Sequence, residues 1–247
     1  MTELHIILIT MVFLLAGLMK GVIGFGLPTV SLGLLVMIVE LPTAIALMLV
    51  PSFATNVWQS MAGGNALYIV KRIGPFLLAA TLSVWLGASL LAKIDLIWAT
   101  VILGVLLMVY AISQIFGWAL VKSAQKPVWL GPVAGCANGI FAGLTGASIF
   151  PGLIYLHSLD FKRDELIQAM GMLFILSTIG LAVAFNAHNL LDIQVGWVSV
   201  WAIFPAVAGM MVGKKLRQYL SEEQFKQTFF ISLLVLGLII IFKAISQ

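Results

Sequence analysis

The chain contains 247 residues, of which 62% are apolar and 9% are charged, whereas ordinary soluble domains carry about 25% charged residues. Its mean hydropathy of +1.15 and its long charge-free runs exclude a soluble domain and predict an all-α polytopic membrane protein. The net charge of +4 comes from basic residues between the apolar runs, which indicates membrane orientation and argues against a nucleic-acid partner.

The two halves of the sequence repeat one pattern, about 120 residues apart. The matching clusters are Ala16-Gly17-x-x-Lys20-Gly21-x-x-Gly24-x-Gly26-x-Pro28 and Ala134-Gly135-x-x-Asn138-Gly139-x-x-x-Gly143-x-x-Gly146, with Pro151 after the second. Each cluster is followed by a short apolar stretch, an acidic turn residue and three longer apolar runs. The sequence therefore predicts a duplication, with repeats over residues 1–122 and 123–247.

In chain order, each repeat is predicted to begin with a broken or re-entrant helical hairpin and to continue with three transmembrane helices. In the first repeat these elements are residues 4–39, 42–62, 74–92 and 96–117, and in the second they are 128–158, 164–186, 193–212 and 224–242. The hairpin arms are short, because residues 4–19 make only about 24 Å of helix against a hydrocarbon core of about 30 Å.

The distribution of Lys and Arg distinguishes two possible topologies. If each glycine cluster belongs to one interrupted span, giving eight crossings and a parallel repeat, five basic residues lie on one side and seven on the other. If each cluster forms a hairpin, giving an inverted repeat, ten lie on one side and only Lys93 and Lys243 on the other. The ten are Lys71, Arg72, Lys122, Lys126, Lys162, Arg163, Lys214, Lys215, Arg217 and Lys226. Because basic loops remain in the cytoplasm, we expect two inverted repeats with both termini outside. Re-entrant and fully crossing hairpin arms both fit this count.

The two breaks are predicted to form an anion site. Pro28 and Pro151 each precede a short apolar stretch, so a second hairpin arm is expected to begin at each proline and to present free N–H groups. Lys20 precedes the first break, and Asn138 is matched to it in the second half. Thr145 and Ser148 add hydroxyl groups, whereas no Asp or Glu falls inside the apolar runs.

The long helix after each hairpin carries a polar face. Ser52, Thr55, Asn56 and Gln59 are spaced i, i+3, i+4 and i+7 and therefore lie on one side of a helix. The second half has a weaker version with Gln168 and Thr178. Three plainer interpretations stay open. The glycine clusters can serve only close helix packing, Lys20 can extend to the membrane surface, and Asn56 and Gln59 can simply hydrogen-bond a neighbouring helix.

The candidate substrate-binding residues are Lys20, Gly24, Gly26, Pro28, Asn56, Gln59, Asn138, Gly143, Thr145, Gly146, Ser148 and Gln168. We expect no catalytic residue, because the apolar runs hold no metal-binding H-E-x-x-H motif, paired aspartates or Ser/His couple. We expect no metal and no cofactor either, because the single cysteine, Cys136, and the three histidines form no cluster with ligand spacing.

The duplicated pattern, with Gly21-Val22-Ile23-Gly24-Phe25-Gly26-Leu27-Pro28 in one half and Gly139-Ile140-Phe141-Ala142-Gly143-Leu144-Thr145-Gly146 in the other, resembles the TauE/SafE sulfite-exporter family. The resemblance covers nearly the whole chain. It implies a multi-pass permease of the bacterial inner membrane that moves sulfite or small organosulfonates, commonly outward.

The favoured function is a secondary transporter that exports a small sulfur oxyanion or organosulfonate held at the two breaks. Export needs no coupling ion, because expelling one negative charge from a negative interior gains about 2.3 kcal/mol per 100 mV. The alternatives are an anion channel or an importer of a different small organic anion, and, in another class, a membrane-embedded enzyme or assembly factor.

Overall fold

Long apolar helices make up almost all of the structure, a computed structural model that describes residues 2–61, 63–117, 128–191, 193–219 and 221–246. The helices are α1 (Glu3–Ile23), α2 (Leu27–Leu35), α3 (Leu41–Met61), α4 (Ala66–Leu91), α5 (Leu96–Ile115), α6 (Leu130–Thr145), α7 (Gly152–His157), α8 (Arg163–Ala187), α9 (Ile193–Trp201), α10 (Ile203–Leu216) and α11 (Glu222–Ile245). Within the described residues, seven helical segments are long and apolar enough to cross a membrane. The prediction of an all-α polytopic membrane protein is therefore confirmed.

Three elements differ from their expected limits. Helix α1 continues to Ile23, beyond the expected end of the first hairpin arm at residue 19, and is long enough to cross a membrane. Helix α4 begins at Ala66, not at residue 74, so Lys71 and Arg72 lie in its first turns, where exposed cations are compatible with a helix that extends beyond the bilayer. The single helix expected over 193–212 is interrupted at Ala202, which separates α9 from α10. Pro205 explains this break, because it has no N–H to donate and its ring clashes with the carbonyl four residues earlier.

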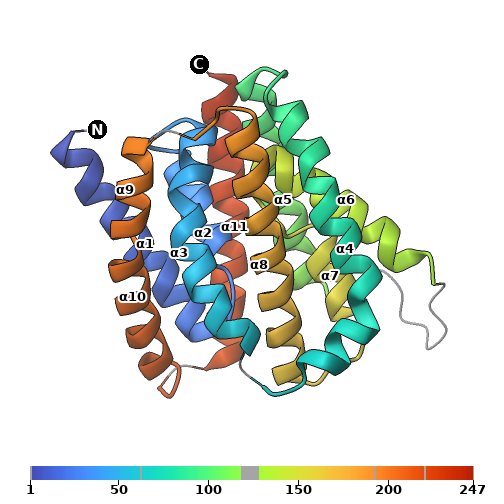
Figure 1. The fold of residues 1–247 in the computed structure, drawn as a ribbon. Coiled ribbons are helices and arrows are strands. Elements are labelled where there is room, and N and C mark those ends of the chain that lie inside the picture. The colour runs from blue at the N-terminus through green and yellow to red at the C-terminus, as the bar shows by residue number, and fades with distance from the viewer. Residues whose placement is uncertain (1, 62, 118–127, 192, 220, 247) are drawn as a thin grey trace.

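The helices pack as pairs, with α1 against α10, α4 against α6, α3 against α8 and α5 against α11 (Figure 1). The glycine clusters make the first two pairs possible. A Cβ atom on Gly17 would lie 2.1 Å from the Ala206 carbonyl oxygen, and one on Gly139 would lie 2.1 Å from the Ala80 carbonyl oxygen. Close helix packing is therefore an observed role of these glycines.

The same close contacts recur in both halves of the chain. Gly21 faces Gly213 across the α1–α10 pair, and Gly143 faces Gly87 across the α6–α4 pair. The two hairpin glycines are separated by 122 residues and their two partners by 126 residues. Each hairpin arm therefore packs against a helix of the other half.

A second recurring contact involves the tips of the hairpins. A Cβ atom on Gly24 would lie 3.4 Å from Cδ1 of Ile167 in α8, and one on Gly146 would lie 2.6 Å from Cγ1 of Ile45 in α3. Gly146 follows Gly24 by 122 residues, and Ile167 follows Ile45 by the same number.

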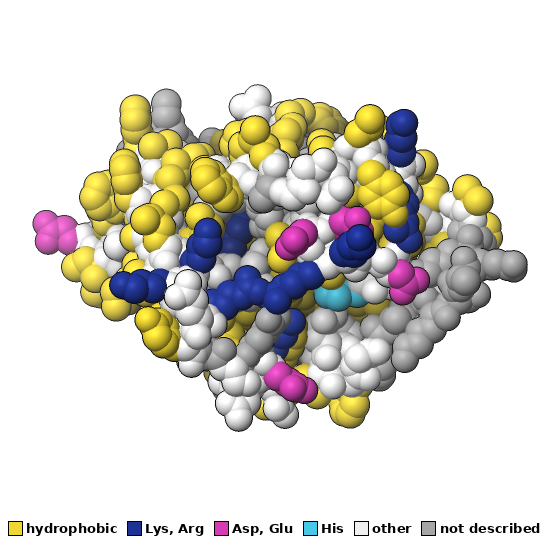
Figure 2. Space-filling view, turned by 90° about the horizontal axis from the view of Figure 1, so that it is seen from below, with side chains coloured by type: hydrophobic (Ala, Val, Ile, Leu, Met, Phe, Trp, Pro, Cys, Tyr) yellow, Lys and Arg dark blue, Asp and Glu magenta, His cyan; other side chains and the backbone are white. Residues whose placement is uncertain are grey.

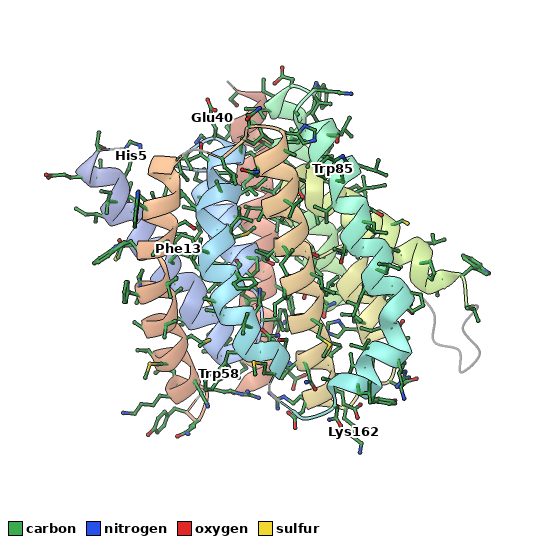
Figure 3. All side chains as sticks on the ribbon, in the orientation of Figure 1. His5, Phe13, Glu40, Trp58, Trp85 and Lys162 are labelled. Carbon is green, nitrogen blue, oxygen red and sulfur yellow. The ribbon has the colours of Figure 1, made fainter. Side chains whose placement is uncertain are left out.

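The first hairpin enters and leaves the bundle at the same end. His5, near the start of α1, and Glu40, after α2, both lie at the upper end in Figure 3, where Figure 1 also places the two termini. Lys162, which precedes α8, lies at the lower end (Figure 3). The helices that follow the two hairpins, α3 and α8, therefore start from opposite ends of the bundle.

Basic side chains gather on the lower face of the bundle (Figure 2). The helix ends that meet there carry Lys71, Arg72, Lys162, Arg163, Lys214, Lys215, Arg217 and Lys226. Lys93 follows α4 and Lys243 ends α11, at the opposite end. Lys122 and Lys126, which the sequence assigns to the basic side, lie outside the described residues.

Candidate functional site

Each glycine cluster ends in a sharp break between two helices. Gly24 ends α1 with φ of 97° and Gly26 precedes α2 with φ of 103°, a backbone conformation that side chains other than glycine rarely tolerate. Gly146 ends α6 in the same left-handed region, with φ of 77°. The second arms begin beside the two prolines, because Pro28 is the second residue of α2 and Pro151 directly precedes α7.

Lys20 is buried at the lower end of α1, with 4% of its surface exposed. Its ammonium group donates hydrogen bonds to Oγ1 of Thr55, at 3.2 Å, and to Oδ1 of Asn56, both in α3. The Thr55 hydroxyl in turn donates to the Pro51 carbonyl at 2.9 Å. The side chain therefore turns into the protein and does not extend to the membrane surface, and both of its partners are neutral.

Several buried polar atoms have no hydrogen-bond partner among the described residues. They are Oγ of Ser52, Nδ2 of Asn56, Oε1 of Gln59, the hydroxyl of Tyr110, Nδ2 of Asn138 and Oγ of Ser177. Unpaired polar atoms are costly in a low-dielectric interior. Three of these unpaired atoms, in Ser52, Asn56 and Gln59, lie on the face of α3 that holds Lys20.

Asn138 connects the two arms of the second hairpin. Its Oδ1 accepts a hydrogen bond from the Gly152 N–H at 3.1 Å, so the first N–H of α7 is already bound by a side chain. Helix α2, by contrast, has no side chain capping its first turn. The sequence predicts two open helix N-termini, one in each hairpin. The first turn of α2 has no side-chain cap, as expected, whereas the first N–H of α7 is bound by Asn138.

Thr145 also serves the backbone of the second break. Its hydroxyl donates to the Phe141 carbonyl at 2.7 Å and accepts from the Ala147 N–H at 3.3 Å. Ser148 is buried in the segment that connects α6 to α7. Gly143 lies against α4, because a Cβ atom there would be 2.0 Å from the Val84 carbonyl oxygen.

Gln59 and Gln168 join the lower ends of α3 and α8. The Gln59 amide donates to the Ile167 carbonyl, and the Gln168 amide donates to the Ser60 carbonyl, both at 2.8 Å. The Gln168 carbonyl oxygen also accepts from the Asn65 N–H at 3.1 Å. We call this pair of reciprocal amide contacts the glutamine clamp.

Eight of the twelve predicted site residues therefore fall into three local groups. Lys20 and Asn56 form the first, the glutamine clamp the second, and Asn138, Thr145, Gly146 and Ser148 the third. The other four, Gly24, Gly26, Pro28 and Gly143, belong to the first break and to the α6–α4 contact. Among the described residues, no hydrogen bond joins a side chain of the first group to a side chain of the third.

The recurring contacts and the sequence pattern pair the two halves differently. In the contacts, each residue of the first cluster corresponds to a residue four positions, about one helical turn, beyond the partner that the sequence pattern gives it. Gly17, Gly21 and Gly24 correspond in their contacts to Gly139, Gly143 and Gly146, so Lys20 corresponds to Ala142 and not to Asn138. Small residues recur every four positions in both clusters, and therefore a shift of four residues matches the sequence almost equally well. Lys20 therefore has no charged counterpart at the corresponding position of the second half.

Sequence reasoning missed two of the unpaired polar side chains, Ser177 and Tyr110. Ser177 follows Thr55 by 122 residues, the spacing that relates the hairpin glycines, so this repeat distance is a signal that would have found it. Tyr110 is fully buried and its ring meets Phe230 edge to face, with 5.6 Å between centroids. No sequence feature distinguishes it from an ordinary core tyrosine.

A family model described as "Sulfite exporter TauE/SafE" matches residues 9–240 of the chain. The match includes both glycine clusters, all three groups of polar residues and every candidate span except the ends of the first and last. Comparison with curated proteins and with solved structures gives no significant match.

Proposed function

Since the chain belongs to the TauE/SafE sulfite-exporter family, we propose that it exports a small sulfur oxyanion or organosulfonate, sulfite or a related anion, from the cytoplasm. Membership makes the protein a membrane transporter and not an enzyme. Efflux of an anion from a negative interior proceeds with the membrane potential, at about 2.3 kcal/mol per charge and 100 mV. The proposal therefore requires no coupling ion.

The observation that carries the proposal is the environment of Lys20. Its ammonium group is buried, and within the described part of the chain it is held only by the neutral oxygens of Thr55 and Asn56. A buried cation without a carboxylate partner is unfavourable unless an anion joins it. The unpaired Nδ2 of Asn56 and hydroxyl of Ser52, on the same face of α3, provide further donors for the oxygens of that anion.

The substrate site is proposed to extend to the break that follows Lys20. Helix α2 begins at Leu27 with no side-chain cap, so its first N–H groups are available to a negatively charged ligand. Asn138, with its unpaired Nδ2, Thr145 and Ser148 are proposed to complete the site from the second hairpin when the two halves approach each other.

Two inverted repeats are proposed to rock around this site. The recurring contacts of Gly21 with Gly213 and of Gly143 with Gly87 support the repeat, and so do the opposite starting ends of α3 and α8. Broken helices in corresponding positions of inverted repeats are typical of substrate sites in secondary transporters.

The basic lower face is proposed to face the cytoplasm of a bacterial cell, with both termini outside. The positive-inside rule supports this orientation, because eight described basic residues lie at the lower helix ends and only Lys93 and Lys243 at the other end.

Efflux from proteoliposomes tests the proposal. Vesicles loaded with sulfite, sulfoacetate, taurine, sulfate or thiosulfate are placed under an imposed potential, and release is followed for the wild type, Lys20→Ala and the matched control Lys93→Ala. We expect saturable, potential-sensitive release of sulfite or an organosulfonate by the wild type and the control. In Lys20→Ala the apparent affinity is expected to fall about tenfold to hundredfold, as for the loss of a charge-assisted contact.

Other outcomes would change the assignment. Unchanged affinity in Lys20→Ala would remove Lys20 from the site. Currents that rise linearly with potential and do not saturate would indicate a channel, and uptake driven by an imposed ion gradient would indicate an importer. No movement of any of the five compounds would contradict the proposed substrate class.

A further inference from the structure

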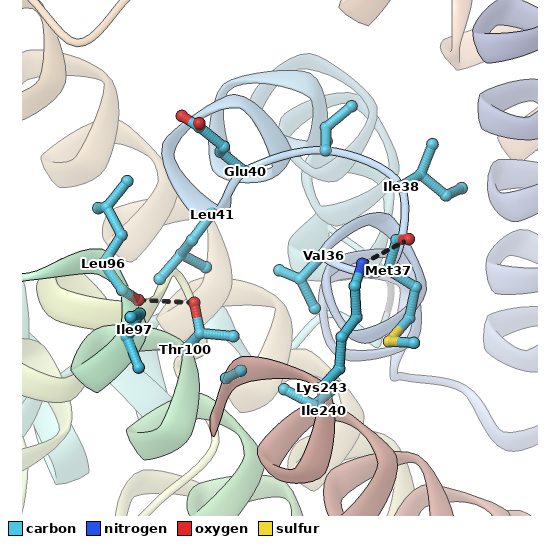
Figure 4. Close-up of a pocket in the computed structure, with 12 residues that line it drawn as sticks. Val36, Met37, Ile38, Glu40, Leu41, Leu96, Ile97, Thr100, Ile240 and Lys243 are labelled. Atoms are coloured by element: carbon cyan, nitrogen blue, oxygen red, sulfur yellow. Dashed lines mark hydrogen bonds between the residues drawn. The ribbon is translucent and has the colours of Figure 1, made fainter. Parts of the chain in front are cut away.

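A cavity of about 440 Å³ opens at the upper end of the bundle, far along α3 from Lys20. Its walls are the turn between α2 and α3, the first turns of α5 and the last turns of α11 (Figure 4). Thr100 lies on one wall, and its hydroxyl donates to the Leu96 carbonyl at 2.7 Å. The cavity does not contain any of the residues that the proposed transport site uses.

One cation and one anion line this cavity without pairing. Lys243 reaches across from α11 and donates to the Met37 carbonyl at 2.9 Å, which leaves two N–H groups of its ammonium for another acceptor. Glu40 lies at the rim above Leu41 (Figure 4). Among the described residues, its carboxylate has no hydrogen bond and no ion pair, with Lys243 or with any other group.

The cavity lies at a boundary between apolar and polar surface. Close to its lining residues, α5 exposes Trp98 and α11 exposes Phe242 and Ile245, with 64%, 76% and 69% of their surfaces accessible. These side chains provide an apolar surface for hydrocarbon directly beside a charged cavity. The arrangement fits an amphiphile whose head enters the cavity while its chains lie along α5 and α11.

We propose that this cavity binds a zwitterionic headgroup that carries a primary ammonium and a phosphate, as in a phosphatidylethanolamine lipid. Glu40 accepts from the ammonium, and Lys243 donates to the phosphate. A cavity of this volume is large enough for such a headgroup with its glycerol, since small-molecule sites begin near 300 Å³. The same chemistry is offered by a free zwitterion such as phosphoethanolamine.

Native mass spectrometry of the detergent-solubilised protein tests the site. Phosphatidylethanolamine and phosphatidylcholine with identical acyl chains are titrated separately, because a quaternary ammonium cannot donate a hydrogen bond to Glu40. We expect about tenfold tighter binding of phosphatidylethanolamine, as for one charge-assisted hydrogen bond. Free phosphoethanolamine is added as a competitor to distinguish a lipid site from a site for a soluble zwitterion.

Three variants separate the two contacts. Glu40→Ala, at an exposed side chain without a partner, removes both the charge and the acceptor and is expected to abolish the preference for phosphatidylethanolamine over phosphatidylcholine. Lys243→Gln keeps a donor for Met37 and is expected to weaken both lipids alike by about tenfold, since it loses the charge that faces the phosphate. Lys93→Gln, exposed at the same end but outside the cavity, is the control.

Binding that is equal for the two lipids in the wild type would overturn the proposal, and so would a preference that persists in Glu40→Ala. Competition by free phosphoethanolamine at concentrations comparable to those of the lipid would support the zwitterion chemistry and assign it to a soluble ligand. Failure of competition would assign it to the lipid. None of these results depends on transport, so the site stands or falls separately from the proposed exporter function.

Discussion

Asn138 and Gly152 depend on each other at the second break. Gly152 allows the Asn138 side chain to reach its N–H, because a Cβ atom at residue 152 would lie 2.4 Å from Oδ1 of Asn138. Gly152→Ala is therefore expected to lower the free energy of unfolding by about 1–3 kcal/mol, the usual effect of overpacking a buried contact. The thermal midpoint in detergent measures this change.

The double variant Asn138→Ala/Gly152→Ala is the control for this clash. It removes the atom that the new methyl group meets, so its midpoint is expected to equal that of Asn138→Ala alone. Additive losses would show that the destabilisation comes from elsewhere in α7.

Gln168 provides a test of whether a predicted site residue contacts substrate. Its amide is occupied by the Ser60 carbonyl and the Asn65 N–H. Gln168→Ala is therefore expected to destabilise the protein by about 1–3 kcal/mol, through the buried backbone groups that lose their partner, and to leave the KM for efflux unchanged.

Lys20→Ala is the matched comparison, because its KM for efflux is expected to rise. A KM in Gln168→Ala that rises as much as in Lys20→Ala would place Gln168 in the substrate site after all.

At these positions the sequence predicts which residues face inward and not what they contact. The spacing of Ser52, Thr55, Asn56 and Gln59 is sufficient to place them on one buried face of α3, which is what the structure has. Lys20 bonds two of them, whereas Gln59 bonds a carbonyl of α8 that is 108 residues away. Periodicity carries no information about such distant acceptors, so residues proposed to bind substrate and residues of the glutamine clamp have the same sequence pattern.

At the scale of helices, the glycine pairs determine how closely α1 and α10 approach. Gly17→Ala places a methyl carbon 2.1 Å from the Ala206 carbonyl oxygen, and backbone atoms cannot move aside as a flexible side chain can. We expect a loss of about 1–3 kcal/mol or more in stability, seen as a lower thermal midpoint and reduced yield.

Gly196→Ala is the matched control for this prediction. It lies in α9 with nothing within 4 Å of the added methyl group, so it is expected to leave stability unchanged or to raise it by up to about 1 kcal/mol through helix propensity. Equal midpoints for the two variants would contradict the role of Gly17 in packing.

Hydropathy and breaker residues predict the helices well, because a lipid-facing backbone must satisfy its hydrogen bonds within each segment. The exceptions have local causes. Pro51 lies inside α3 without ending it, because the Leu47 carbonyl that loses its backbone donor accepts from Ser199 of α9 at 2.8 Å. Pro205 coincides with an interruption at Ala202. Only the structure distinguishes these two prolines.

At the scale of the whole molecule, the two topologies that the sequence allows place Lys93 differently. With eight simple crossings, Lys93 and Lys215 share one side and Lys71 lies on the other, whereas with hairpins Lys71 and Lys215 lie together, opposite Lys93. All three side chains are exposed at helix ends, so each position tolerates a cysteine. Cys136 is exposed on α6 and has to be replaced by alanine first.

Labelling of Lys71→Cys, Lys93→Cys and Lys215→Cys with a membrane-impermeant thiol reagent tests this arrangement in intact bacterial cells. We expect only Lys93→Cys to react before permeabilisation and all three to react afterwards, because the basic helix ends are retained in the cytoplasm. Joint labelling of Lys93→Cys and Lys215→Cys would instead require a parallel repeat. A parallel repeat has no inverted halves, so the proposed rocking could not expose the site alternately to the two sides.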